Sequence, residues 1–285
     1  MREDDCIAFL RWALPRLRFR WEGFRRVRRQ VCRRLGRRLH ELELNTLEGY
    51  RDRLESDPGE WVVLDSLCRV TISRLYRDRA VFDVIGDVIL PERGESASLR
   101  SRRIRCWCAG CASGEEVYTL RILWDLKVQP EMPHVQLEVI GTDADAVVLQ
   151  RAERACFSSG SLKEVPAHWR DLAFERHDQD YCVHPVHREG ITFERQDIRF
   201  GFPAGPFDLV FCRNLVFTYF EIALQRAVLE RIAAVVREGG YLVIGAHEQL
   251  PNGNPLFEPL VGSRQIYRKV RRERKSEIGE AAGSP

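Results

Sequence analysis

The chain has 285 residues, of which 44% are hydrophobic and 31% are charged, and its formal net charge is +3. This length suffices for one large domain or two modest ones with a sizeable core, and the small net charge argues against a molecule that binds polyanions over its whole surface. No apolar run approaches the ~20 residues that a membrane helix needs, and the acidic first residues lack the pattern of a signal peptide. We therefore expect a cytoplasmic protein with no segment inserted in a membrane.

The nine cysteines are scattered through helix-like and strand-like segments. This odd number without a regular framework favours reduced, mostly buried thiols over disulfides. Cys106, Cys108 and Cys111 form a C-x-C-x-x-C run, but alternate strand residues share a face while Cys111 falls in the following turn. Small buried thiols explain the run better than a metal centre. Cys182 with its neighbouring histidines is likewise expected to hold no metal, so we predict no metal site.

Residues 1–90 show helical periodicity, with apolar residues recurring at helical spacing and arginines between them. The expected helices lie within 21–42, from a cap at Asn45 or Thr46 to 54, from 61 onward, and over 80–89 with an end at Pro91. Residues 91–101 have the composition of a linker. We therefore predict an N-terminal helical domain over residues 1–90, joined by a linker over 91–101 to the rest of the chain.

Eleven arginines and a single acid, Glu22, lie between Arg16 and Arg38. One interpretation is a solvated helix face balanced by the acids that follow in the chain. A second is a docking face for an acidic, receptor-like protein partner. A third, less favoured, is RNA, and we expect no nucleic-acid partner.

From residue 102 onward the patterns of strands and helices alternate, which is typical of a mainly parallel sheet with helices on both faces. The expected strands cover 104–109, 136–142, 181–185, 191–196, 207–212, 241–245 and 265–269. The expected helices cover 115–127, 144–154, 166–172 and 222–236. We predict an α/β, Rossmann-like domain over 102–270 with a small β insert at about 156–190. The tail over 271–285 is expected to be disordered.

The most informative segment runs from 103 to 120 and is predicted to form a strand, a turn of small residues and a helix. Gly110 lets a ligand approach the backbone, Ser113 suits a helix cap, and Glu115 and Glu116 fall in the first helical turn. Such a unit binds nucleotide-like ligands in open α/β sheets. Two carboxylates stand where phosphate would bind, and the glycine spacing of dinucleotide and P-loop sites is absent. This pattern favours a ligand with a cationic amino group and no phosphate, such as S-adenosylmethionine.

Three later segments end in polar residues at predicted strand ends. Asp143 follows an apolar strand and is suited to accept hydrogen bonds from ribose hydroxyls. Asp197 and Ile198 could serve an adenine amine and cover its ring. Arg213 and Asn214 close another apolar strand and present a cation and an amide to the same edge.

Together these segments resemble the CheR-type protein-glutamate O-methyltransferases. The family patterns W-x-A-G-C-x-[ST]-G-E-E-P-Y-S, G-T-D-I-D, F-D-x-I-F-C-R-N-x-x-x-Y-F and G-H-S-E have counterparts, in this order, at 107–119, 141–145, 207–220 and 246–248. Upstream, residues 71–77 match the loop N-x-T-x-F-F-R. The resemblance covers about residues 18–270.

The resemblance implies an S-adenosylmethionine site and assigns residues to it. Arg77 would hold the carboxylate of the cofactor or lie close to its methyl group, Glu116 would face its amino end, and Tyr219 would lie near the acceptor. The implied cofactor ligands are Thr71, Ser73, Arg77, Gly110, Glu116, Asp143, Asp197, Ile198, Arg213 and Asn214. The implied catalytic residues are Arg77, Arg213 and Tyr219.

The chain departs from the family mainly at the acceptor side. Four residues separate Asn214 from Tyr219 where the family has three, which turns Tyr219 by about 100° on a helical segment. Thr71 and Ser73 replace Asn and Thr, Leu75 replaces an aromatic residue, and Val117 replaces proline. The predicted function is methyl transfer to a protein glutamate. The alternatives are a methyltransferase with a small-molecule or another protein acceptor, and a regulatory module that binds the cofactor without catalysis. An acceptor that must lose a proton would need a base, for which Tyr219, His247 and Glu248 are the candidates by position.

Overall fold

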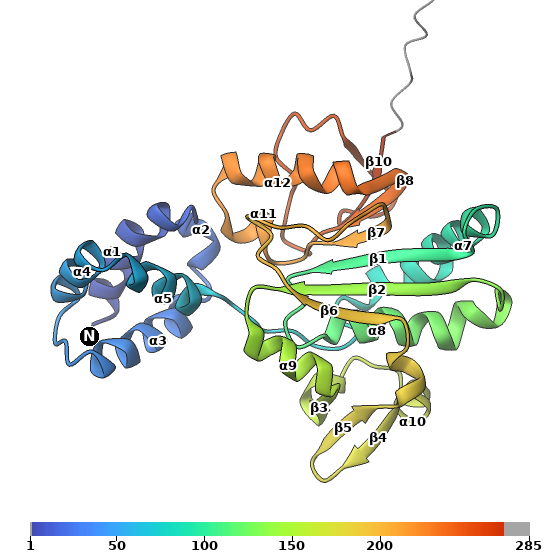
Figure 1. The fold of residues 1–285 in the computed structure, drawn as a ribbon, viewed down its shortest axis with the longest axis horizontal. Helices are drawn as coiled ribbons and strands as arrows, with labels where there is room; N and C mark the ends of the chain where they lie inside the picture. The colour runs from blue at the N-terminus through green and yellow to red at the C-terminus, as the bar shows by residue number, and fades with distance from the viewer. Residues whose placement is uncertain (1, 271–285) are drawn as a thin grey trace, which may run out of the picture.

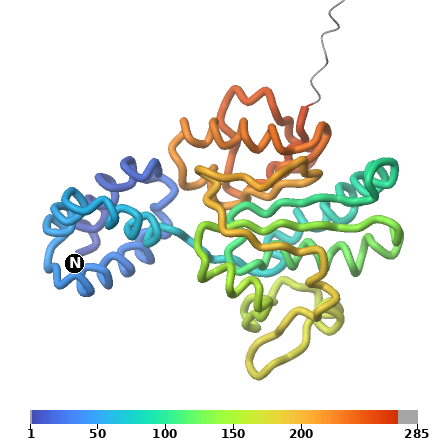
Figure 2. The backbone as a smooth tube through the Cα atoms, viewed as in Figure 1, coloured from blue at the N-terminus to red at the C-terminus, as the bar shows by residue number. Residues whose placement is uncertain are grey.

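The computed structural model describes residues 2–270, which form a helical body and an α/β body (Figure 1). The helical body lies at the left of Figure 1 and consists of α1 (Glu3–Ala13), α2 (Trp21–Phe24), α3 (Arg28–Glu41), α4 (Leu47–Ser56) and α5 (Pro58–Cys68). The chain then crosses to the α/β body through residues 69–78, as the tube in Figure 2 makes plain. The predicted cap at Thr46 is confirmed, because its side chain accepts a hydrogen bond from the amide of Gly49.

The central sheet has seven strands in the order β6–β2–β1–β7–β8–β10–β9. Their bounds are β1 (Arg103–Ala109), β2 (Gln136–Asp143), β6 (Ile191–Arg195), β7 (Phe207–Phe211), β8 (Val236–Val243), β9 (Phe257–Pro259) and β10 (Ile266–Lys269). The first five in this order are parallel, and β10 runs antiparallel to both of its neighbours. The expected mainly parallel sheet is confirmed. Strand order reverses between β1 and β7, and the carboxyl ends of strands at such a reversal form the ligand crevice of open α/β sheets.

Helices cover both faces of this sheet (Figure 1). The helices that pack on its strands include α8 (Glu115–Leu123), α9 (Ala146–Arg154) and α12 (Ile222–Val235). Helix α10 (Ala167–Ala173) belongs to the insert that follows α9, and α11 (Val216–Tyr219) lies at the carboxyl edge beside α2. Side chains of β1 point alternately to the two faces of the sheet, and this divides the core in two. Cys106 and Cys108 pack with α8 on one face. Trp107 and Ala109 pack with α12 and the helical body on the other. The core therefore runs from the sheet into the N-terminal helices.

The predicted linker over 91–101 and the predicted helix end at Pro91 are wrong. Helix α6 (Arg79–Val84), a π-helical turn (Ile85–Ile89) and α7 (Leu90–Ser98) follow one another without a break. The wide π turn comes directly before Pro91, which has no amide hydrogen to donate to the preceding turn. Gly94 is small because a Cβ there would collide with the sulfur of Met132. These helices share a core with the sheet, and we propose residues 69–78 as the connection between the two domains.

The insert after α9 is a three-stranded antiparallel sheet in the order β3–β5–β4, with bounds β3 (Cys156–Ser158), β4 (Phe174–His177) and β5 (Asp180–Val183). Of these only β5 was anticipated, and the sequence patterns also missed β9 and α11. The predicted tail over 271–285 lies outside the described residues. No helix within residues 2–270 is both long and apolar enough to cross a membrane.

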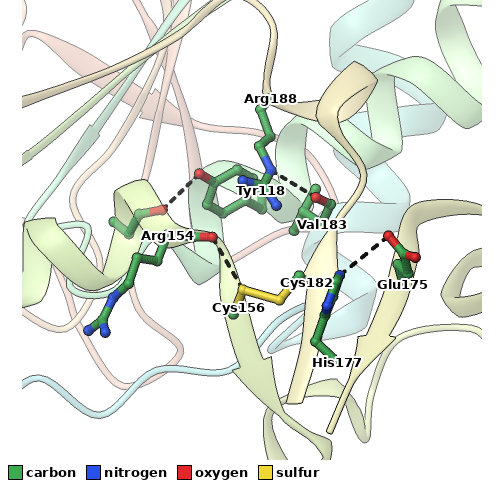
Figure 3. Close-up of a disulfide and its surroundings, with 9 residues drawn as sticks. Tyr118, Arg154, Cys156, Glu175, His177, Cys182, Val183 and Arg188 are labelled. Atoms are coloured by element: carbon green, nitrogen blue, oxygen red, sulfur yellow. Dashed lines mark hydrogen bonds and ion pairs between the residues drawn. A yellow bond between two sulfur atoms is a disulfide. The ribbon is translucent and has the colours of Figure 1, made fainter.

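The expectation of reduced thiols throughout is wrong for four of the nine cysteines. Cys156 and Cys182 face each other across β3 and β5 and form a disulfide, and Cys6 and Cys32 join α1 to α3 (Figure 3 shows the first pair). Both pairs are 26 residues apart in sequence, so only the tertiary structure brings them together. The remaining five are free and buried: Cys68, Cys106, Cys108, Cys111 and Cys212. No cluster of metal-ligating side chains occurs in the part of the chain that the structure describes.

Candidate methyl-transfer site

A cavity of about 600 Å³ lies at the carboxyl edge of the sheet, beneath the helical body. Its floor comes from the segments that follow β1, β2, β6 and β7, and its roof comes from α2 and the connecting residues 69–78. All of the predicted site residues line this one cavity. They are Thr71, Ser73, Arg77, Gly110, Glu116, Asp143, Asp197, Ile198, Arg213, Asn214 and Tyr219.

The turn after β1 and the carboxylate of Asp143 fix each other. Gly110 has a φ of +70°, and a Cβ there would come within 2.6 Å of Leu215, so only glycine fits. The Asp143 carboxylate accepts hydrogen bonds from the amides of Ala112 and Asp145, each at 3.0 Å. Burial raises the pKa of Asp143, and these two hydrogen bonds oppose the rise. Gly114, and not Ser113, occupies the N-cap position that precedes α8.

Arg213 is the centre of a buried ion-pair network at the inner end of the cavity. Its side chain is 5% exposed and donates to Glu116 at 2.9 Å and, in a shorter contact, to Asp78. The other carboxylate oxygen of Glu116 has no hydrogen-bond partner among residues 2–270. Burial raises the pKa of Glu116, while Arg213 opposes that rise. Sequence reasoning missed Asp78, because nothing local indicates that the residue after Arg77 meets the end of β7.

Asp197 is held by Arg199 and is not a free loop acid. The Arg199 guanidinium donates to Asp197 at 2.6 Å and to Asp65 on α5 at 2.6 and 2.8 Å. Burial alone would raise the pKa of Asp197, but the hydrogen bonds from Arg199 outweigh it and the pKa is lowered. This chain of charges ties the helical body to the sheet edge beside Ile198.

Helix α11 is fixed from two sides. Glu248 is 5% exposed and accepts hydrogen bonds from the amides of Asn214 and Gly245, at 2.8 and 2.6 Å, and from the Thr218 hydroxyl at 2.6 Å. From the helical body, Arg20 donates to the carbonyl of Thr218 at 3.0 Å. Both oxygens of Glu248 are therefore engaged, and this residue positions α11 and offers no free base.

Tyr219 packs against the ring of Phe24 with centroids 5.0 Å apart, and its hydroxyl has no hydrogen-bond partner among the residues described. Burial raises the pKa of Tyr219 to about 12, so the hydroxyl stays protonated near pH 7. Arg25 and Arg26 also line this side and form no ion pair with an acid within residues 2–270.

Acids outnumber cations on the cavity floor, where Glu116, Asp143 and Asp197 lie with Arg199 and Arg213. Cations outnumber acids on the roof, where five arginines lie with Glu22 and Asp65. The cavity can therefore hold a cationic donor beside an anionic acceptor.

Comparison with known proteins gives the family. Residues 71–266 match the family described as "CheR methyltransferase, SAM binding domain". A chemotaxis protein methyltransferase of Listeria monocytogenes is 30% identical over 194 residues, which cover 67% of this chain and 71% of that protein. Chemotaxis protein methyltransferase 2 of Vibrio cholerae is 26% identical over 80% of each chain.

Two further matches differ in how much of the other protein they cover. An uncharacterized 104.1 kDa protein of Rhodobacter capsulatus is 28% identical over 85% of this chain, which spans only 25% of that protein. The crystal structure of the N-methyltransferase NodS from Bradyrhizobium japonicum matches 65% of this chain and 99% of its own, with 13% identity and a TM-score of 0.34. The family match covers more than half of the chain and includes the cavity floor. The chain belongs to the CheR methyltransferase family and is an S-adenosylmethionine-dependent methyltransferase.

Proposed function

We propose that this enzyme transfers the methyl group of S-adenosylmethionine to the side-chain carboxylate of a protein glutamate, which becomes a methyl ester. The observation that carries the proposal is the division of charge within one cavity. Glu116 and Asp143 face it from the floor, while Arg77, Arg25 and Arg26 face it from the roof and outnumber the acid Glu22 beside them. A cationic donor and an anionic acceptor would each find charges of opposite sign.

The residues of the floor fit the donor. The unpartnered oxygen of Glu116 would receive its ammonium group, and Asp143 retains lone pairs for the ribose hydroxyls beyond its two backbone hydrogen bonds. Asp197 and Ile198 would take the adenine, and Gly110 would let the donor approach the backbone. When bound, S-adenosylmethionine supplies a methyl group already activated by the sulfonium. The remaining proposed ligands are Thr71, Ser73, Arg77, Arg213 and Asn214.

The acceptor side favours a carboxylate over an amine or a thiol. A glutamate is ionised at neutral pH and loses no proton on methylation, whereas an amine or thiol needs a base. Tyr219 is protonated and Glu248 is fully hydrogen-bonded, so neither supplies that base. Of the three candidates this leaves His247, an exposed residue of the cavity lining. Orientation then dominates, and it can lower a barrier by as much as ~7–11 kcal/mol.

Arg77 is the proposed anchor of the acceptor carboxylate or of the donor's own carboxylate. Its guanidinium forms no ion pair with an acid among residues 2–270 and makes one long hydrogen bond, at 3.4 Å, to the carbonyl of Ile72. Arg213, in contrast, is already neutralised by two acids. A guanidinium at the cavity wall that is paired with no acid of the described residues is available for a bidentate bond to a carboxylate.

We also propose that an acidic protein partner docks on α3. Several arginines of the predicted docking segment have internal partners, such as Arg34 with the carbonyl of Leu67 and Arg38 with Glu60. Arg29, Arg33 and Arg37 are exposed and recur every fourth residue, so they form one stripe along the helix. Arg29 lies 3.7 Å from Glu3, whereas Arg33 and Arg37 form no ion pair within residues 2–270. Positive charge gathered on one face favours the interpretation as a docking face for an acidic partner. It speaks against the interpretation as a solvated face whose charge is balanced by acids of the same chain.

The reaction is tested by incubating the purified chain with methyl-labelled S-adenosylmethionine and a lysate, then treating the labelled protein with mild base. Release of label as methanol is expected, because carboxyl methyl esters are base-labile. Label that resists base, or label in small molecules, would contradict the glutamate assignment and favour another acceptor. Arg77→Ala is expected to lower kcat/KM for the acceptor at least tenfold, at about 1.4 kcal/mol per factor of ten. The control Arg79→Ala removes a neighbouring arginine that does not line the cavity and is expected to leave kcat/KM unchanged.

The partner is tested separately. The double variant Arg33→Ala/Arg37→Ala should weaken binding of an acidic protein and reduce the salt dependence of binding, since two exposed cations are removed. Arg226→Ala, an exposed arginine on α12, is the control. Binding to RNA that exceeds binding to acidic proteins would refute this docking proposal and leave the reaction untouched.

A further inference from the structure

Asp78 lies at the start of a helix but does not cap it. It precedes α6 at the N-cap, where an aspartate ordinarily accepts a hydrogen bond from an amide of the first helical turn. Here the side chain makes no such cap, and the backbone adopts a φ of +63° in the left-handed region. The carboxylate instead turns toward the sheet edge and meets the guanidinium of Arg213. Asp78 thus gives up its local cap for a contact with a residue that lines the cavity, and such an exchange points to a role in the site.

This role follows from the charges around Arg213. That guanidinium is 5% exposed, and the acids that face it are Glu116 from α8 and Asp78 from the connecting segment. The carbonyl of Arg77 also accepts from it, at 3.4 Å, and the ring of Phe82 lies 5.7 Å away. Without Asp78, Arg213 would form an ion pair with Glu116 alone. A buried cation neutralised by one acid would leave no net negative charge for a cationic ligand.

We propose that Asp78 is a positioning residue that, together with Glu116, leaves one net negative charge around Arg213, and that this charge makes the cavity prefer the cationic S-adenosylmethionine over its neutral product. Both ligands carry the ammonium group that would meet Glu116, so the preference comes from the sulfonium, which only S-adenosylmethionine has. The inference rests on the proposed placement of the donor's ammonium group at Glu116, and it requires nothing of the acceptor. S-adenosylmethionine carries one positive charge, at the sulfonium, that S-adenosylhomocysteine lacks. Removing the charge of Asp78 therefore affects the two ligands unequally.

The test compares the dissociation constants of the two ligands by calorimetry on the full chain. In Asp78→Asn, the ratio of the S-adenosylmethionine constant to the S-adenosylhomocysteine constant is expected to rise about tenfold, from one elementary charge within about 10 Å at an effective dielectric constant of about 20. Asparagine tolerates a positive φ, so the backbone is retained. Asp78→Glu keeps the charge and should keep the wild-type ratio. Asp87→Asn removes one acid from the same helical run, where it pairs with Lys127 outside the cavity, and should leave the ratio unchanged.

Two results would overturn the inference. If both constants in Asp78→Asn rise by the same factor, Asp78 is structural only, and if neither changes, it has no part in donor binding. Thermal melting checks that the variant is folded, and Asp78→Gly, which also suits this φ, replaces it if it is not. Because no acceptor is present in the experiment, its failure leaves the proposed carboxyl methylation intact. The absence of methyl esters in the labelling experiment would likewise leave the ligand ratio measurable.

Discussion

Glu115 offers a pH-linked test of how the first turn of α8 is built. It lies beside Glu116, is 6% exposed, and one of its carboxylate oxygens is buried without a hydrogen-bond partner in the described residues. Burial raises the pKa of Glu115 from its ordinary 4.5 to about 7. A carboxyl group whose pKa is raised on folding binds its proton more tightly in the folded state. Folding stability from this group is therefore lost as pH rises from about 4.5 to 7.

The size of the effect on folding stability follows from the rise in the pKa of Glu115. A pKa raised from 4.5 to about 7 corresponds to about 3 kcal/mol between the protonated and ionised forms, at about 1.4 kcal/mol per unit. Glu115→Gln keeps the shape and cannot ionise, so it should be more stable than the wild type by up to about 3 kcal/mol at pH 8.5 and similar to it at pH 4.5.

The assay is denaturant unfolding of both proteins at the two pH values. A stability difference that is the same at pH 4.5 and pH 8.5 would refute the reasoning, because it would show that ionisation of Glu115 costs nothing on folding. Glu55→Gln, an exposed acid on α4, serves as the control and should show no difference at either pH.

Three further variants probe the cavity. Glu116→Gln should weaken S-adenosylmethionine binding about tenfold in calorimetry, because a neutral amide replaces a charged partner of the ammonium group, and unchanged affinity would contradict that role. Tyr219→Phe should leave the pH dependence of kcat between pH 6 and 9 unaltered, since its pKa of about 12 keeps the hydroxyl protonated; a lost ionisation in that profile would contradict this. Glu248→Gln should lower the free energy of unfolding by about 2 kcal/mol, because an amide nitrogen, itself a donor, replaces one of the two oxygens that accept from three donors, and an unaffected denaturation midpoint would argue against the network.

The floor of the site could be predicted because its signals are local. Gly110, Asp143 and Arg213 each follow a run of apolar residues with strand character, and parallel strands in one sheet bring their carboxyl ends to one edge. Once the alternation of strands and helices is recognised, the parallel topology predicts that these three residues lie close together. The same argument explains why the sheet itself was correctly anticipated.

The features that sequence reasoning missed depend on tertiary contacts. Gly94 and Pro91 suggest a linker until the close approach of Met132 and the π turn are known. The pairing of Cys156 with Cys182 depends on the register between β3 and β5. The encounter of Asp78 with Arg213 joins residues 135 positions apart. No periodicity or spacing encodes such pairs.

The most direct test of the central claim is calorimetry of S-adenosylmethionine against the wild-type chain and Asp143→Ala, with ADP as the phosphate-bearing comparison. An acid-lined floor predicts one donor molecule bound per chain, no measurable binding of ADP, and a loss of at least about 100-fold in donor affinity in the variant, as expected when hydrogen bonds to a buried carboxylate are removed. Asp145→Ala, whose carboxylate instead caps α9, is the control. Equal affinity of wild type and Asp143→Ala for the donor, or tight binding of ADP, would contradict the account.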